Sequence, residues 1–551
     1  MSARLALALG LVAAAAGTAR AQADEADRFY ADKADDDRDG SLWQGALTSS
    51  SLAFAEAAAA ADPLVAGGAS AEVASSVAKL WTELRLQLDG RHLKGGRWDV
   101  RVDTRLRYVA SAFDNLKGDA NRIQAGLFGT NEYELRELYA VRGGRRTDVF
   151  VGRQVVADLG AIRVDGIRVD YAKNARWTYL GFAGAYPARG SRSVATDYPR
   201  GVTIAPDPVM PGGIAETATG RVIPITGGFG AAYRTQNSYG AIGAVTIVPT
   251  SRDEGAGGNG TYELARLYLA ANGYWRKSAK LDLWHYVVLD LYGTAGVSPT
   301  NASVGLQYKP TSRLRLQLAG NQIDTEALNV QVRALLENDA PQGGPIINNY
   351  QVQRIGNTMV RGAVSALLGR QRRFELTAAL HGRRRPDVVL VGGAGPQVLP
   401  AAQSLEVHGQ LVDRHFYGGL RAEASVMRSV SLGQASYARS VAQVIRVGGT
   451  RELKGGRAQV TGDLSWVSSA DDNAGKTCSP GMVATCYGSA NTNAFQLSAL
   501  GYYRWKADWF VTGSAGLGLQ QITVTDPIGG GGVAQPAIKS VQLFARVGYR
   551  F

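Results

Sequence analysis

The chain has 551 residues, of which 68 are glycine, 18 are proline and 23 are tyrosine. This composition, without a collagen repeat, is typical of many short strands and turns and argues against a helical or disordered chain. The formal net charge is +13, but most basic residues are single arginines between apolar residues, and the one dense cluster, GRRRPD at 382–387, is too short for a nucleic-acid-binding arm. We expect one large β architecture and no nucleic-acid partner.

Residues 1–21 have the features of a secretory signal peptide. Arg4 precedes an apolar run at residues 5–16, and Ala19 and Ala21 fit an A-x-A cleavage site. Beyond this segment, no apolar run reaches the roughly 20 residues that a membrane-spanning helix needs. The sequence therefore predicts an exported protein that is either soluble or a membrane β-barrel.

Residues 22–78 are acidic at first, then rich in alanine, and do not alternate. We expect a periplasmic leader, a lumen plug or a disordered arm, with a strand hidden within 41–78 as an alternative. In DDDRDGSL, Asp35, Asp37 and Asp39 match the first half of a calcium loop, but Ala46 occupies the place of the bidentate glutamate. A solvated acidic run is the preferred interpretation and calcium the weaker one, and we expect no cofactor and no metal.

From residue 79 to the end, apolar and polar residues alternate in segment after segment. In LWTELRLQL, four leucines share one face of a strand and the polar residues share the other, and the closing SVQLFARVGYRF, which ends on Phe551, follows the same period. Period-two alternation predicts strands with two different environments. The charged residues expected on the polar face are Glu83, Arg85, Arg101, Asp103, Arg105, Arg107, Arg313, Arg315, Arg373, Arg421, Glu423, Arg457, Arg546 and Arg550.

The connections between these segments are of two kinds. Short turns are expected at 142–146, 309–312 and 454–457, and longer polar segments at 187–222, 322–348, 384–400, 468–489 and 525–536. Short turns on one rim and long loops on the other are typical of outer-membrane barrels, in which the short turns are periplasmic. We therefore predict an all-β fold: a closed antiparallel transmembrane β-barrel over residues 79–551, in contact with outer-membrane lipid and built of about 18 strands (roughly 16 to 22).

The two cysteines, Cys478 and Cys486, lie eight positions apart in CSPGMVATC. In an oxidising compartment we expect one small disulfide that pins a loop tip. A metal site is the less favoured alternative, because no histidine lies near the two thiols.

Catalytic motifs are missing from the sequence. The five histidines are scattered, and neither G-x-S-x-G nor H-E-x-x-H occurs. Membrane-embedded hydrolases can assemble a site across strands, so a hydrolase stays as an alternative. We expect a protein that is not an enzyme.

The charged strand faces suggest a function, because arginines outnumber carboxylates on them. A basic lumen wall keeps a pore hydrated and lowers the barrier for anions. The alternative is that arginines and carboxylates pair across strands and only hold the wall together. Both interpretations can hold at once.

One segment, NEYELRELYAVRGGRRTDVFVGRQVVADLGAIRVDGIRVDYA (131–172), resembles part of the alginate-export type of outer-membrane barrel. The resemblance rests on two short motifs and on the aromatic C-terminal strand. The motif residues are Gly152, Arg153 and Gln154, followed by Asp165, Gly166 and Arg168.

This resemblance implies a channel that exports an exopolysaccharide, with a periplasmic polysaccharide-export protein as a possible partner and with recognition of Phe551 by the barrel-assembly machinery. A general or solute-specific porin for small anionic nutrients is the alternative function. A surface adhesin is a further one.

Overall fold

The computed structural model describes residues 41–60, 73–109, 132–187, 198, 200–206, 214–221, 223–248, 250–251, 261–262, 264, 266–292, 297–325, 355–386, 388–392, 395–399, 401–432, 439–453, 455–472, 489–525, 532–534 and 537–551. Twenty-two strands form one antiparallel sheet that closes on itself, because the last strand pairs with the first. In order around the barrel they are β1 (Leu42–Ala60), β2 (Val73–His92), β3 (Trp98–Val109), β4 (Glu132–Gly143), β5 (Thr147–Val156), β6 (Ile162–Ala172), β7 (Trp177–Ala185), β10 (Ile225–Arg234), β11 (Ser238–Val248), β14 (Arg266–Ser278), β15 (Leu281–Tyr292), β16 (Ser298–Thr311), β17 (Leu314–Thr325), β18 (Ile355–Leu368), β19 (Phe374–Arg385), β22 (Ala402–Asp413), β23 (Leu420–Leu432), β24 (Arg439–Leu453), β25 (Ala458–Asp472), β26 (Ser489–Arg504), β27 (Trp509–Thr525) and β29 (Ile538–Arg550).

The remaining elements are small. Three hairpins stand apart from the barrel sheet: β8 (Arg200–Pro206) with β9 (Ile214–Arg221), β12 (Thr250–Ser251) with β13 (Thr261–Tyr262), and β20 (Val388–Gly392) with β21 (Gly395–Leu399). The strand β28 (Gly532–Ala534) adds to the end of β27. Three short helical turns, α2 (Leu93–Gly96), η4 (Ala157–Leu159) and η5 (Arg370–Arg372), complete the described elements.

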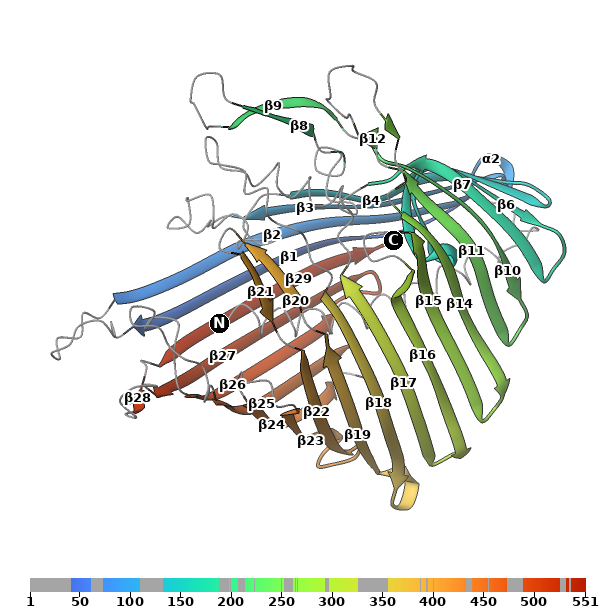
Figure 1. Ribbon diagram of the computed structural model, residues 1–551. Coiled ribbons are helices and arrows are strands. Elements are labelled where there is room, and N and C mark those ends of the chain that lie inside the picture. The colour runs from blue at the N-terminus through green and yellow to red at the C-terminus, as the bar shows by residue number, and fades with distance from the viewer. Residues whose placement is uncertain are drawn as a thin grey trace.

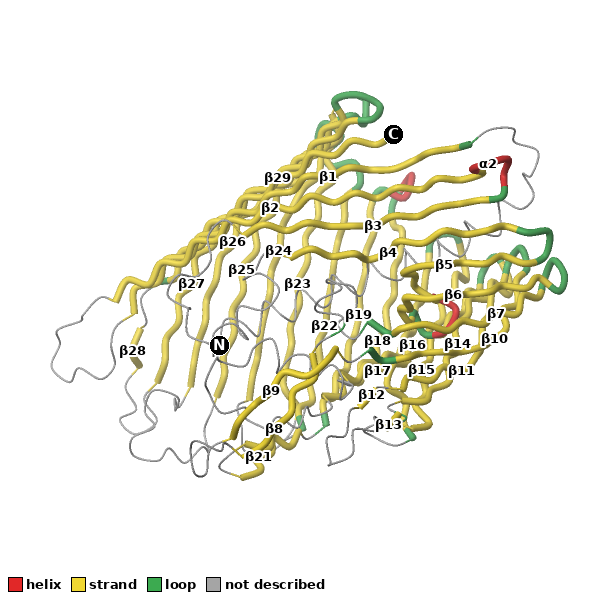
Figure 2. The backbone as a smooth tube through the Cα atoms, turned by 90° about the horizontal axis from the view of Figure 1, so that it is seen from above, coloured by secondary structure: helices red, strands yellow, loops and turns green. Residues whose placement is uncertain are grey.

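The seam of the barrel lies between β1 and β29. Figures 1 and 2 show these two strands side by side, blue and red in Figure 1, with β2 and β27 flanking them. At the end of the seam, Phe551 and Gly45 exchange two backbone hydrogen bonds of 2.8 and 3.1 Å. Closure of this kind leaves no free sheet edge, as a membrane-spanning sheet requires.

The connections separate into two rims, as the sequence predicts. The short turns expected at 142–146, 309–312 and 454–457 join β4 to β5, β16 to β17 and β24 to β25, and all three lie at the same rim as Phe551. The predicted longer segments join strands at the opposite rim. We call the two ends the short-turn rim, which faces the periplasm in outer-membrane barrels, and the long-loop rim.

The outer face of the sheet is apolar. Leu84, Leu106, Ile242 and Leu543 alternate with inward-facing residues and are 43%, 50%, 60% and 52% exposed. A continuous surface of large apolar side chains at such exposure is unfavourable in water but favourable in contact with lipid chains. The described residues contain no helix that is long and apolar enough to cross a membrane.

Two predictions of the fold need correction. The barrel has 22 strands, not about 18, and it begins before residue 79, since β1 occupies much of the expected leader and β2 starts at Val73. The alternation fails in the middle of β1 because the outward positions there carry the small residues Ser49, Ser51, Ala53 and Ala55. The hidden strand considered within 41–78 is therefore real.

Candidate functional site

The inner wall of β2–β4 is charged, but its charges are paired. Arg85 donates from Nε and Nη2 to the two carboxylate oxygens of Asp103, at 2.9 and 2.7 Å. Arg105 and Arg107 both reach Glu83, at 3.1 and 3.3 Å. A bidentate guanidinium–carboxylate pair is among the strongest polar contacts available to a protein.

Further pairs extend this network toward β4. Arg101 contacts Glu137, and Arg105 also contacts Glu134. The side chain of Arg107 is only 6% exposed. The arginines predicted at 85, 101, 105 and 107 therefore do point inward, yet cross-strand pairing neutralises them and stabilises the wall.

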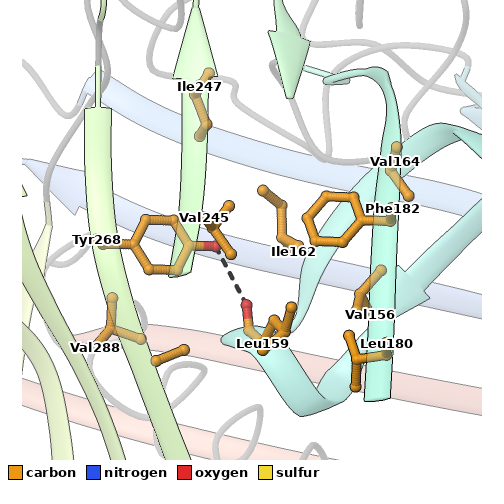
Figure 3. Packing of buried hydrophobic residues seen from close by; sticks show 11 residues of the cluster. Val156, Leu159, Ile162, Val164, Leu180, Phe182, Val245, Ile247, Tyr268 and Val288 are labelled. Atoms are coloured by element: carbon orange, nitrogen blue, oxygen red, sulfur yellow. Dashed lines mark hydrogen bonds between the residues drawn. The ribbon is translucent and has the colours of Figure 1, made fainter. Parts of the chain in front are cut away.

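The inner wall from β6 to β15 is different, because much of it is apolar. A buried cluster formed by Val156, Leu159, Ile162, Val164, Leu180, Phe182, Val245, Ile247, Tyr268, Ala270 and Val288 lies on the inside of the barrel, where β5–β7 and β11–β15 contribute inward-facing residues (Figure 3). The expectation that the lumen takes only the charged faces is wrong for these strands. The cluster residues are at most 6% exposed, so this part of the inner wall offers little surface to the lumen.

The wall from β16 to β23 is basic. Its inward-facing charged residues are Lys309, Arg315, Arg361, Arg383, Arg385 and Arg421 on the basic side and Glu375, Glu406 and Glu423 on the acidic side, and His381 and His408 also face inward. Part of this charge is neutralised, since Arg383 lies 3.6 Å from Glu406 and Lys309 lies 3.2 Å from Asp282 on β15. The Nε atoms of Arg361 and Arg383 are buried without a hydrogen-bond partner among the described residues. This wall therefore carries an excess of positive charge toward the lumen.

A pocket of about 330 Å³ lies at the short-turn end of this wall. It is lined by Ala279, Lys280, Lys309, Pro310, Thr311, Ser312, Arg313, Leu314, Arg315, Ser365, Leu367, Glu375 and Arg414. Glu375, the one carboxylate in this lining, is engaged by Arg414 at 2.6 Å. The pocket is consequently basic.

A second pocket, of about 310 Å³, lies at the long-loop end of the same wall. Arg383, Ser404 and Ser431 are neighbours in one cross-strand row of β19, β22 and β23. The full lining comprises Asn357, Arg383, Arg385, Ala402, Gln403, Ser404, Ser429, Ser431 and Ser440. Guanidinium and hydroxyl donors without a lining carboxylate form a setting for an oxyanion.

Strand β19 connects the two pockets. Glu375 lines the first, and Arg383 and Arg385 line the second. Eight to ten residues of extended strand separate them, which corresponds to roughly 26–33 Å. Both pockets thus belong to one basic path along the wall.

Several predicted residues lie elsewhere than expected. Arg313 and Arg457 are in turns at the short-turn rim, not in strands, and Arg373 lies just before β19. Arg373 forms a 2.6 Å ion pair with Asp413, and this pairing raises the pKa of its guanidinium. The alternation extends into these turns, and for that reason the pattern assigned these arginines to strand faces, although Arg457 also lies within the turn expected at 454–457.

The remaining predicted arginines lie in strands. Arg315 on β17 and Arg421 on β23 face inward, and Glu423 lies 3.8 Å from Arg446. Arg546 donates a 2.9 Å hydrogen bond to the hydroxyl of Ser50 across the seam. The guanidinium of Arg550 stacks 5.0 Å from the ring centroid of Phe510.

The two short motifs come together on β5 and β6. Gly152 faces Gly166 and Arg153 faces Asp165 in register, and Arg153 donates to the Asp165 carboxylate at 2.7 and 2.5 Å. A Cβ on Gly152 would lie 2.2 Å from the carbonyl oxygen of Leu138.

The other motif residues, Gln154 and Arg168, are buried on the same strands. Arg168 pairs with Asp158 and Asp170. The motif residues therefore stabilise the local packing of β5 against β6.

A residue from outside the barrel strands caps this motif. The Tyr198 hydroxyl donates to Asp165 at 2.5 Å. Burial and this hydrogen bond raise the pKa of Tyr198 above its ordinary value.

Other predictions fall outside the described residues. These are the signal peptide, Asp35, Asp37 and Asp39 of the weak calcium candidate, and the expected Cys478–Cys486 disulfide. Within the described ranges, no three histidine, cysteine, aspartate or glutamate side chains gather as metal ligands.

The sequence analysis did not identify Ser404 and Ser431 of the long-loop pocket, Arg361, or the two lysines of the pocket at the short-turn end. The run RRR at 383–385 held a usable signal, because in a strand its first and third arginines share a face. Arg383 and Arg385 indeed point inward, while Arg384 between them is exposed on the outer face.

No protein-family model and no curated protein matches the sequence. Solved structures that resemble the chain include OccD3 of Pseudomonas aeruginosa (9% identity, 92% of this chain and 91% of that one, TM-score 0.34). Others are the copper transporter OprC (11%, 92% and 80%, 0.43) and a bacterial polysaccharide outer membrane secretin (12%, 60% and 92%, 0.28). At these identities and TM-scores the likenesses show nothing about what this chain carries. The closed antiparallel sheet, its apolar outer face and its charged inner walls make this chain a β-barrel of the bacterial outer membrane.

Proposed function

We propose that this protein is an outer-membrane channel that exports an anionic polysaccharide, without covalent chemistry on its substrate. The observation that carries the proposal is the basic path of β16–β23, which joins a pocket at one rim to a pocket at the other. The paired walls of β2–β4 contribute little net charge, so the path differs electrostatically from them.

The charge of the path favours an anion. The short-turn pocket offers Lys280, Arg313 and Arg315, all of them exposed, and the long-loop pocket offers Arg383 and Arg385. A lumen lined by cations lowers the electrostatic barrier for anions and raises it for cations. Arginine is also well suited to bidentate contact with carboxylate or sulfate groups.

The length of the path favours a polymer. A single sugar or a small nutrient anion cannot span the roughly 26–33 Å between the pockets. A chain of charged sugars can occupy both pockets at once and move by exchange between weak sites, because each contact alone is modest.

Two measurements test the proposal. In cells, deletion of the gene is expected to leave polysaccharide in the periplasm and to reduce it at the surface. In planar bilayers, the purified barrel is expected to show a reversal potential that favours anions and to be blocked by an acidic oligosaccharide more strongly than by a neutral one of equal length.

A pair of matched variants assigns the effect to the path. Replacing Arg383 and Arg385 by Ser should reduce anion preference and block. Arg384→Ser removes one arginine charge from the outer face of the same strand and should leave both unchanged, so each inward single variant, Arg383→Ser and Arg385→Ser, is compared with it. Unchanged selectivity in the inward double variant would refute the proposed path.

A solute-specific porin for small anions is the second candidate, since a pocket of about 310 Å³ also suits one small oxyanion. A porin would conduct small ions equally well with and without acidic oligosaccharide. Its deletion would leave surface polysaccharide intact.

A further inference from the structure

The connection between β5 and β6 lies at the long-loop rim. It consists of residues 157–161 only, includes the single turn η4, and folds toward the barrel interior, where it contacts β10, β11 and β14. We call residues 157–161 the inward loop. Figure 3 shows Leu159 of this loop surrounded by the buried cluster.

Leu159 is seated in a notch made by two glycines. It is fully buried, and a Cβ on Gly230 or on Gly243 would lie 2.7 or 2.4 Å from its Cδ2 atom. Real Cβ contacts are never this short, so the notch exists only because both positions are glycine. The fit of side chain to notch fixes the depth of the loop in the lumen.

Asp158 is anchored by polar contacts. Its carboxylate accepts a 3.1 Å hydrogen bond from Arg168 and a short one from the Tyr239 hydroxyl, and Arg234 lies 3.6 Å away. The side chain of Asp158 is 8% exposed. A buried carboxylate held by partners from β6, β10 and β11 resists movement, since any displacement leaves charge unpaired in a dry site.

The loop backbone is also held. The Asn272 side chain donates to the carbonyl oxygen of Ala157 at 3.0 Å, and the Tyr268 hydroxyl donates to that of Leu159 at 3.3 Å. Both donors belong to β14, and the buried cluster lies between β14 and β5. The loop is therefore bound to the inside of the wall across several strands.

From these contacts we infer that the inward loop is a fixed constriction that sets the width of the pore. It fills the part of the lumen along β6–β15 with a dry core and confines passage to the space in front of the basic path. The inference rests on the proposed channel function and adds the residues that decide which substrates fit. A mobile gate would not be held by a fully buried side chain like Leu159, packed against two glycines, or by a carboxylate like Asp158, which has partners on three strands.

The test replaces residues 157–161 by an Asn-Gly turn, which suits a two-residue hairpin. We expect single-channel conductance to rise roughly 1.5-fold or more, and larger neutral polyethylene glycols to enter the pore. The same replacement of residues 173–176, an exposed turn at the short-turn rim, is the matched control and should change neither quantity. A folded loop-replaced barrel with wild-type conductance and polymer cut-off would overturn the inference.

A second readout does not depend on conduction. In a background with Cys478 and Cys486 replaced by Ser, Ala270→Cys places a thiol in the buried cluster. A water-soluble maleimide should not label it while the inward loop is intact, and should label it once the loop is replaced. Equal labelling of both would contradict a fixed loop. Labelling that depends on the loop in a barrel without conductance would reject the channel function while retaining the loop assignment.

If the replacement does not fold, Asp158→Asn combined with Leu159→Ala weakens both anchors with the chain length unchanged. Folding is checked by the heat-dependent shift in gel mobility. We expect the labelling of Ala270→Cys to increase in this variant, and unchanged protection would argue against anchoring by these two side chains.

Discussion

The guanidinium group of Arg383 lies 3.6 Å from the carboxylate of Glu406, which faces the same part of the path. The carboxylate also lies 3.5 Å from His381. Glu406 therefore moderates the positive charge of the long-loop pocket, and its removal has a defined sign.

We expect Glu406→Gln to strengthen anion preference, because it removes the negative charge that partly neutralises Arg383 while keeping the side chain's size. The reversal potential in a salt gradient measures the change. Asp508→Asn removes an equal charge from an exposed turn at the short-turn rim and serves as the control. A shift toward cations in Glu406→Gln would contradict the assignment of this wall to the lumen.

The Arg85–Asp103 pair should behave as a structural contact. Asp103→Asn leaves Arg85 part-buried opposite a neutral partner and is expected to cost about 3 kcal/mol of unfolding free energy. Replacing both residues by Met and Leu should restore most of that loss, since an apolar pair avoids the desolvation of two charges. Denaturant unfolding in detergent measures both, and ion selectivity should stay at the wild-type value in the double variant, which leaves the net charge of the wall unchanged.

The strands most visible in the sequence were those with two contrasting faces. Strand β29 was predicted from its alternation, and its outward Leu543 and inward Arg546 match that reading. Strand β1 was expected only as an alternative, a strand hidden within 41–78, because Ser and Ala at most of its outward positions carry no lipid-facing signal. Its place in the barrel is set by pairing with β2 and β29, and such pairing between distant segments leaves no mark in local sequence.

The inward-facing charged residues were likewise predictable where the two faces of a strand differ in polarity. Alternation identified Arg85, Arg101 and Arg105 as inward-facing, but whether an arginine is paired or open depends on register with its neighbours. Glu83 and Glu134 reach Arg105 from the two flanking strands. The buried cluster was not predictable for a further reason. Its inward-facing residues, such as Leu180 and Val245, are apolar like the outward-facing ones, so the two faces of these strands do not differ in polarity.

Substitutions in the glycine notch test the anchoring of the inward loop through their effect on the free energy of unfolding. Gly243→Ala would place a Cβ 2.4 Å from Leu159 and 2.3 Å from the Phe229 carbonyl oxygen. Neither neighbour can yield without disturbing the cluster, so we expect a loss of about 1–3 kcal/mol. Gly240→Ala on the same strand meets nothing closer than 3.8 Å and should cost far less. Equal midpoints of denaturant unfolding for the two variants would show that the notch is not needed.

The contact between Tyr198 and Asp165 should appear in the dependence of stability on pH. Burial raises the pKa of Tyr198 in the folded protein above the value of about 10 expected in the unfolded chain. As the pH rises past about 10, the unfolded chain loses this proton first, so the stability supplied by the buried hydroxyl is complete below that pH and declines above it. Tyr198→Phe lacks the hydroxyl and its hydrogen bond to the carboxylate, and should be less stable by about 1.5–3 kcal/mol near neutral pH. The gap between wild type and variant in denaturant unfolding should then narrow between about pH 8 and about pH 11, and a gap that widened would mean that the hydroxyl is not held in its neutral form by the fold.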